Sequence, residues 1–184
     1  MNAPDLPNRK NLRLRDYDYS QPNYYYVTIC TKEMRELFWK RRDKNIVTEK
    51  NKVQCRGAHC ASEIKDFGLS NIGKVVDKAI NLIPKKYEAV YVDKYTIMPN
   101  HIHIIIVIKT DENGRAMRAP TLSTVLNQLK GYVTKQVNIK IWQKGFYEEI
   151  IRNENGYQHI WEYIDTNPQK WLNKYYTKAN DITE

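Results

Sequence analysis

The feature that most constrains the fold is a nearly unbroken run of β-branched residues between positions 101 and 108. Positions 104–108 are apolar on both faces of an extended chain, as in a central strand covered on two sides. Alternate side chains of a strand point to the same face, so His101 and His103 stand side by side while Ile102 points away. The run therefore predicts a central strand that carries two imidazoles on one face. Such a pair is either half of a metal site or two histidines that only make hydrogen bonds.

Length and composition bound the class of protein. The chain has 184 residues, of which 41% are hydrophobic, which suits a single domain of residues 1–184 with a proper core. No run of about twenty apolar residues spans a membrane, and the first residues contain no apolar stretch typical of a signal peptide. We therefore expect a cytoplasmic protein with no membrane partner. Three cysteines, an odd number, argue against a disulfide framework.

The charge indicates a polyanionic partner. A net charge of +9 together with 14 tyrosines and 4 tryptophans is typical of proteins that bind nucleic acid and stack on its bases. Residues 1–22 are polar and mixed in charge, and we interpret them as a basic arm, solvated or touching phosphates. The candidate phosphate contacts are Arg13, Arg15, Arg115, Arg118, Lys130 and Lys135.

The first half of the chain alternates strand and helix signals. Residues 24–31 are rich in strand formers, and residues 35–39 predict a short strand or a turn. Residues 40–68 lack periodicity and predict a long inserted loop. A helix follows, with one apolar stripe from 72 to 83, a cap at Ser70 or Asn71, and an end marked by Pro84.

The second half begins with a strand from residue 89, which joins the histidine strand through a tight turn or a bend at 98–100. A second amphipathic helix is predicted over 122–137, a strand over 146–152, and a helix from 154 to 167 that stops at Pro168. Residues 172–184 are predicted to form a tail. The order β-α-β-β-α-β-α predicts an α+β, ferredoxin-like (RRM-like) sandwich, an antiparallel sheet with helices on one face.

The last predicted helix carries two stripes. Its apolar stripe contains Ile160 and Ile164, and the neighbouring polar stripe contains His159, Tyr163 and Asn167, each four residues from the next. Residues four apart lie above one another on a helix, so Tyr163 and Asn167 can face one site together. The simpler interpretation is a partly exposed tyrosine and an asparagine that caps the helix end.

Three ordered motifs carry a family resemblance: Met98–His103, Trp142–Asn153 and Trp161–Pro168. With these motifs the chain resembles, from about Tyr24 to Trp171, the REP-associated tyrosine transposases, relatives of the insertion-sequence-200-like single-tyrosine HUH transposases. The loop at 40–68 departs from the smaller members of that family.

The resemblance implies roles for several residues. His101 and His103 match the HUH histidines, Tyr163 the nucleophile, and Asn167 a further metal ligand; Glu148 matches an acidic auxiliary position. It also implies Mg²⁺ or Mn²⁺ as cofactor, single-stranded DNA next to a hairpin as substrate, and cleavage and rejoining through a 5′-phosphotyrosine. Both monomers and homodimers fit the resemblance. We find no glycine-rich phosphate loop, so we expect no nucleotide cofactor.

Two alternatives use the same features differently. A replication initiator or relaxase keeps the HUH chemistry, but usually sets its tyrosine in other surroundings and often adds a helicase. A non-catalytic binder of single-stranded nucleic acid needs the basic and aromatic surface only, and has no use for His101, His103 and Tyr163 together.

Overall fold

The computed structural model describes residues 17–19, 21–40, 68–109 and 120–180, with side chains up to Lys174. The predicted basic arm with Arg13 and Arg15, most of the predicted loop, and Arg115 and Arg118 lie outside the described residues.

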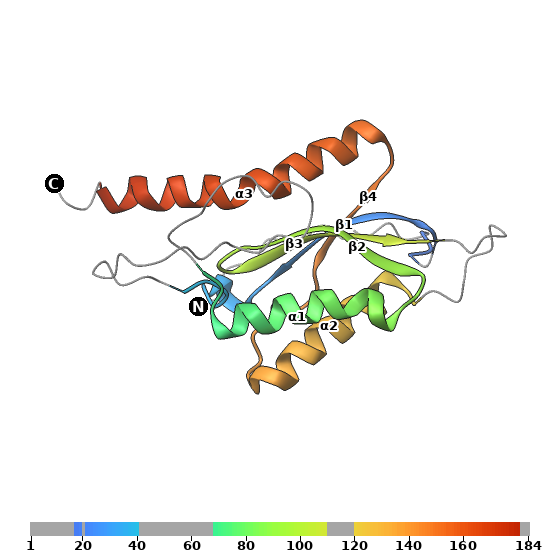
Figure 1. Ribbon diagram of the computed structural model, residues 1–184, viewed down its shortest axis with the longest axis horizontal. Helices are drawn as coiled ribbons and strands as arrows, with labels where there is room; N and C mark the ends of the chain where they lie inside the picture. The colour runs from blue at the N-terminus through green and yellow to red at the C-terminus, as the bar shows by residue number, and fades with distance from the viewer. Residues whose placement is uncertain (1–16, 20, 41–67, 110–119, 181–184) are drawn as a thin grey trace, which may run out of the picture.

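A four-stranded sheet forms the centre of the molecule (Figure 1). Its strands are β1 (Asn23–Cys30), β2 (Val90–Ile97), β3 (His101–Ile108) and β4 (Tyr147–Ile151), in the spatial order β2-β3-β1-β4. The neighbouring strands pair antiparallel throughout. The helices are α1 (Asn71–Lys86), α2 (Leu122–Val137) and α3 (Glu154–Asn180), with a short 3₁₀ turn η1 (Lys32–Met34) after β1. The predicted element order, the α+β class and the central position of the histidine strand are confirmed.

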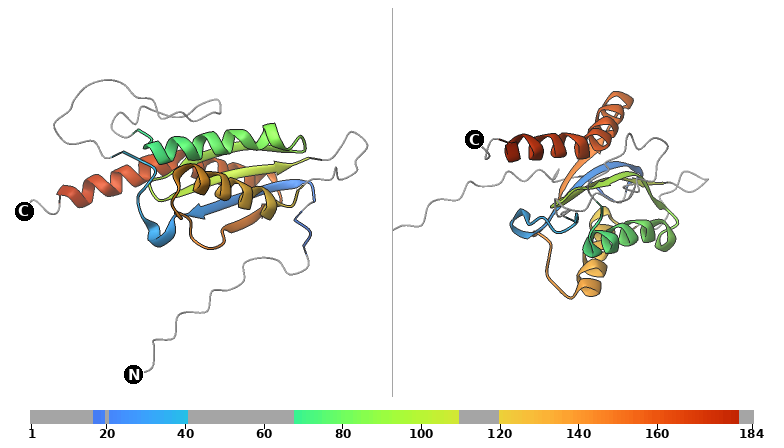
Figure 2. Two further views of the ribbon diagram at one scale, coloured as in Figure 1. Left: turned by 90° about the horizontal axis from the view of Figure 1, so that it is seen from below. Right: turned by 60° about the vertical axis from the view of Figure 1, so that its left-hand side comes forward.

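The helices lie on both faces of the sheet (Figures 1 and 2). Helices α1 and α2 cover one face, where they bury the even-numbered isoleucines of β3 from Ile102 to Ile108. Helix α3 covers the other face, where Ile160 and Ile164 pack against Ile105 and Val107. The expectation of helices on one face thus holds for α1 and α2 only. A strand that is apolar on both faces needs a cover on each, and α3 supplies the second one.

The connection between β2 and β3 is a tight turn, one of the two arrangements that the sequence left open. The Met98 N–H donates to the His101 carbonyl at 2.8 Å. The residues after β1 hold this turn, because Thr31 donates to the Asn100 carbonyl and Phe38 to the Pro99 carbonyl. The start of the histidine strand is therefore fixed from two sides. Residues 35–39, predicted as a strand or turn, lie outside the sheet and make one bridge, from Trp39 to Leu69.

The capping residue predicted the start of α1 correctly, whereas the prolines did not predict the ends of the helices. The Ser70 hydroxyl accepts the Gly73 N–H at 3.0 Å and begins α1, as predicted. The predicted ends at Pro84 and Pro168 are wrong, since α1 continues to Lys86 and α3 to Asn180. A proline inside a helix removes one hydrogen bond and kinks the axis, and Figure 2 shows a bend in α3. Burial of Pro168 and Leu172 compensates for the lost hydrogen bond.

Candidate active site

Two imidazoles converge at the start of β3. The Nε2 atoms of His101 and His103 lie 3.0 Å apart. Both side chains project from the face of the sheet that α3 covers, as the alternation of the strand predicted. His103 is 4% exposed and His101 is half-buried, so the pair is largely shielded from solvent.

Hydrogen bonds hold both rings from behind. The Nδ1 of His101 lies 2.6 Å from the Asn100 Oδ1. The Nδ1 of His103 lies 2.8 Å from the Tyr26 hydroxyl and 2.9 Å from the Thr28 hydroxyl, and Thr28 also donates to Tyr26 at 3.2 Å. An amide oxygen only accepts, so it selects the Nδ1–H form of neutral His101 and leaves a lone pair on its Nε2. Hydroxyls both donate and accept, so His103 is held in either tautomer.

Burial also keeps the pair uncharged. It lowers the pKa of His101 to about 4. Burial, followed by the neighbouring His101, lowers the pKa of His103 to about 3. Both rings are therefore neutral at pH 7, which is the form that binds a metal ion.

The two ring nitrogens are close enough to bind one ion together. Two nitrogens about 2.1 Å from one ion are separated by about 3.0–3.4 Å, depending on the angle between them. A hydrogen bond between the two rings has a similar length. The observed distance between His101 Nε2 and His103 Nε2 is 3.0 Å. Within the described residues no group of three or more His, Cys, Asp and Glu side chains could hold a metal ion.

Helix α3 brings the predicted nucleophile to the histidines. The rings of Tyr163 and His103 contact each other edge to face, with centroids 5.1 Å apart, and Tyr163 is 40% exposed. Two turns later, the Trp171 ring lies 5.9 Å from the His101 ring. Asn167 lies on α3 midway between these two contacts, one turn from each, and is half-buried. Residues at this spacing share one helix face, so the structure brings Asn167 to the stretch of α3 that faces the two histidines.

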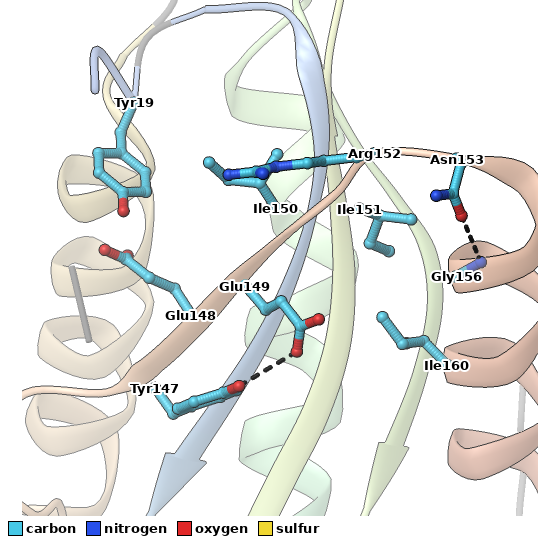
Figure 3. Close-up of a pocket in the computed structure, with 10 residues that line it drawn as sticks. All are labelled: Tyr19, Tyr147, Glu148, Glu149, Ile150, Ile151, Arg152, Asn153, Gly156 and Ile160. Atoms are coloured by element: carbon cyan, nitrogen blue, oxygen red, sulfur yellow. Dashed lines mark hydrogen bonds between the residues drawn. The ribbon is translucent and has the colours of Figure 1, made fainter. Parts of the chain in front are cut away.

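Glu148 does not join this cluster. It lies opposite Val27 of β1, on the sheet face that packs against α1 and α2, and it is buried. Its neighbours Tyr147 and Glu149 face the α3 side, where Tyr147 donates to Glu149 at 3.1 Å. Figure 3 shows Glu148 directed toward Tyr19 and away from Tyr147 and Glu149.

The two described lysines among the candidate phosphate contacts differ. The Lys130 ammonium donates to the backbone carbonyls of Gln143 at 2.8 Å and Gly145 at 3.0 Å, and burial lowers its pKa. That arrangement ties α2 to the segment before β4. Lys135 is exposed near the end of α2, on the face of the sheet opposite the histidines.

A pocket of about 420 Å³ runs along β4 and the start of α3 (Figure 3). Its lining includes Tyr147, Arg152 and Asn153. The histidines do not line it, so it is separate from the paired imidazoles.

Sequence reasoning missed the residues that support the cluster. Tyr26 and Thr28 lie on β1, where Thr28 pairs directly with His103. Their alternation within residues 24–31 placed them on one face, but only the register of β1 against β3 shows that this face carries the histidines. Trp171 was missed because the helix was expected to end before it.

No family model matches the chain. A Haemophilus influenzae protein of uncharacterised function is 29% identical over 185 residues, which covers 90% of this chain and 91% of that protein. An Escherichia coli protein named REP-associated tyrosine transposase is 29% identical over 80 residues, or 43% of this chain and 44% of that protein. The chain thus spans less than half the length of the E. coli relative that it matches.

A solved structure agrees with the fold. The structure described as a REP-associated tyrosine transposase bound to a REP hairpin has a TM-score of 0.55, covers 86% of this chain and 73% of its own, and is 19% identical. The resemblance to REP-associated tyrosine transposases that the sequence motifs predicted is confirmed by these comparisons. Among the described helices, none combines the length and apolarity that crossing a membrane requires.

Proposed function

We propose that this protein is a DNA transposase of the REP-associated tyrosine type, which cuts and rejoins single-stranded DNA beside a hairpin through Tyr163. The single observation that carries the proposal is the contact between Tyr163 and an imidazole pair whose Nε2 atoms converge at 3.0 Å. The named E. coli relative and the hairpin-bound neighbour support the substrate class.

His101, His103 and Asn167 would hold one divalent ion, Mg²⁺ or Mn²⁺. Two neutral imidazoles and a carboxamide oxygen suit Mn²⁺ well, and phosphate oxygens suit both ions. When bound, the ion supplies positive charge that offsets the charge of the scissile phosphate. The chain's own contribution is to hold the two Nε2 atoms close together, because Asn100, Tyr26 and Thr28 support the rings from behind.

Tyr163 would supply the nucleophile. Its hydroxyl oxygen forms a bond to phosphorus while the bond from phosphorus to the 3′ oxygen breaks. The phenolic proton passes to solvent, which reaches this half-exposed side chain, and the leaving 3′ oxygen gains a proton. A 5′-phosphotyrosine and a free 3′-hydroxyl result, and attack by a 3′-hydroxyl on the same phosphorus reverses the step. The rigid helix keeps the hydroxyl near the reacting phosphate, as proximity requires.

Mass spectrometry of a covalent adduct tests this function. Labelled single-stranded hairpin DNA and Mn²⁺ are incubated with the protein, and the modified tyrosine is identified by peptide mapping. We expect the DNA on Tyr163 and no adduct from Tyr163→Phe, with binding of the same DNA nearly unchanged because one oxygen is removed.

Tyr147→Phe is the matched control. Tyr147 is 38% exposed and lies opposite Thr28, on the face of the sheet that carries the histidines. It should form adduct at the rate of the parent protein. Adduct on Tyr147, or full activity in Tyr163→Phe, would refute the assignment. Tight hairpin binding without any adduct would favour a non-catalytic binder.

A further inference from the structure

Strand β2 contains a bulge on the side that meets α3. Val92 lies opposite Ile106 and Lys94 lies opposite Ile105, so Asp93 is one extra residue in the strand. In a regular strand two neighbouring residues point to opposite faces, but a bulge lets both serve one face. Here both Asp93 and Lys94 contact α3.

Each of the two residues holds a different turn of the helix. The Tyr157 hydroxyl donates to the Asp93 carboxylate at 2.7 Å. The Lys94 ammonium lies 2.6 Å from the Asp165 carboxylate, and the two side chains are 10% and 15% exposed. The same ammonium lies 3.0 Å from the centre of the Trp161 ring. Lys94 therefore has a carboxylate and an aromatic face from one helix as its partners, in a nearly closed space.

Few apolar residues hold the first half of α3 on the sheet. Ile160 and Ile164 are its buried residues in the cluster on this face, together with the partly buried Tyr157. Apolar contacts are non-directional, so by themselves they leave a helix some freedom to shift. A charged hydrogen bond at 2.6 Å permits much less. The bulge contacts at Tyr157 and Asp165 lie on either side of Tyr163 in the sequence of α3.

We infer that Lys94 and Asp165 are positioning residues, and that the β2 bulge sets the register of α3 on the sheet so that Tyr163 stands against His103. The effect on catalysis rests on the proposed function. The effect on the position of α3 rests on the fold alone. The ion pair acts through Tyr163 and does not touch the DNA.

Two measurements on the full-length protein test it. Hydrogen–deuterium exchange of α3 amides reports how firmly the helix is held, with α1 amides as an internal reference. Adduct formation with hairpin DNA and Mn²⁺, followed over DNA concentration, separates kcat from KM. Lys94→Met keeps the aliphatic stem and removes the charge, and Asp165→Asn keeps the shape should Lys94→Met fold poorly. Lys78→Met, an exposed lysine of α1 on the other layer, is the matched control.

In Lys94→Met and Asp165→Asn we expect faster exchange in α3 with unchanged α1, and a kcat lower by about tenfold or more with KM within about twofold. The control should match the parent protein in both measurements. Unchanged exchange in α3 would overturn the inference even if no adduct forms with any variant, so its failure is distinct from that of the proposed function.

The double variant Lys94→Met/Asp165→Leu separates positioning from stability. Replacing a buried ion pair by apolar side chains of similar volume often preserves stability. We expect a melting temperature near that of the parent, with kcat still reduced because the directional contact is gone. Recovery of kcat together with stability would show a merely structural role and overturn the inference.

Discussion

The hydroxyls behind His103 should control its metal affinity jointly. Tyr26 and Thr28 lie 2.8 Å and 2.9 Å from the Nδ1 of His103, within a site where that side chain is 4% exposed. Tyr26→Phe and Thr28→Val each remove one hydroxyl at almost constant volume. We predict that either single variant keeps most of the Mn²⁺ affinity, because the remaining hydroxyl still satisfies Nδ1.

The double variant leaves Nδ1 with neither hydroxyl partner, on a side chain that is 4% exposed. Loss of such a supporting partner typically costs about 10- to 100-fold in metal affinity, or about 1.4–2.7 kcal/mol. We therefore expect a loss of that size in Tyr26→Phe/Thr28→Val and less than about fivefold in each single variant. The difference between the double loss and the sum of the single losses measures the shared role of the hydroxyls.

Isothermal titration with Mn²⁺ alone, without DNA, provides the measurement. Tyr25→Phe is the control, because Tyr25 is a buried tyrosine of the same strand whose hydroxyl donates to the Gln21 carbonyl on the other face. Thermal melting of the metal-free variants checks that the fold is intact. Single losses that simply add, or a double variant that binds Mn²⁺ like the parent, would refute the reasoning.

Three further predictions concern the histidines, the net charge and the packing of α1. Burial lowers the pKa of His101 to about 4 and that of His103 to about 3 from 6.5, so only the unfolded state gains protons just below pH 6.5. Urea unfolding of the metal-free protein should therefore show stability falling from pH 6.5 to pH 5 by up to roughly 2 kcal/mol per histidine; a flat profile would contradict this. Hairpin DNA binding should weaken steeply with salt because of the +9 charge, and a fluorescence-anisotropy titration with a salt slope near zero would exclude a DNA partner. Gly73→Ala should lower the free energy of unfolding by about 1–3 kcal/mol, because its methyl group would meet the Phe38 carbonyl; urea unfolding at or above the parent's stability would show that this contact relaxes.

The local pattern of apolar and polar residues was enough to predict the strands and helices. It failed where the alignment of distant strands decides which residues lie together. Strand β3 and the face of α3 follow from period-two and period-3.6 spacing, which the chain carries within a few residues. The partnership of Thr28 with His103 depends on how β1 aligns with β3, 75 residues away. Nothing near Thr28 in the sequence records that alignment, so the residues behind the imidazoles had to come from the structure.

Two features that place α3 were not predicted from the sequence. Pro168 was expected to end α3 because proline disfavours helix in the preceding residue, but the buried Leu172 and the contact of Trp171 with His101 favour continuation. A bulge in β2 turns Asp93 and Lys94 to one face. The sequence of residues 89–97 contains no pattern that predicts this bulge. Both features affect where α3 sits, which is the aspect of the site that the sequence predicted least well.

The position of the site follows from how polarity is distributed along one face of the sheet. Toward one end of that face, Ile105, Val107 and Ile151 are apolar and meet the first turns of α3. Toward the other end, His101 and His103 are polar, and their rings contact Trp171 and Tyr163 of the later turns. The apolar end holds the helix through burial of apolar side chains. The polar end carries the side chains that we propose for metal binding and catalysis. One helix therefore connects both ends, and the packing of its first turns at the apolar end helps to place Tyr163 against the imidazoles.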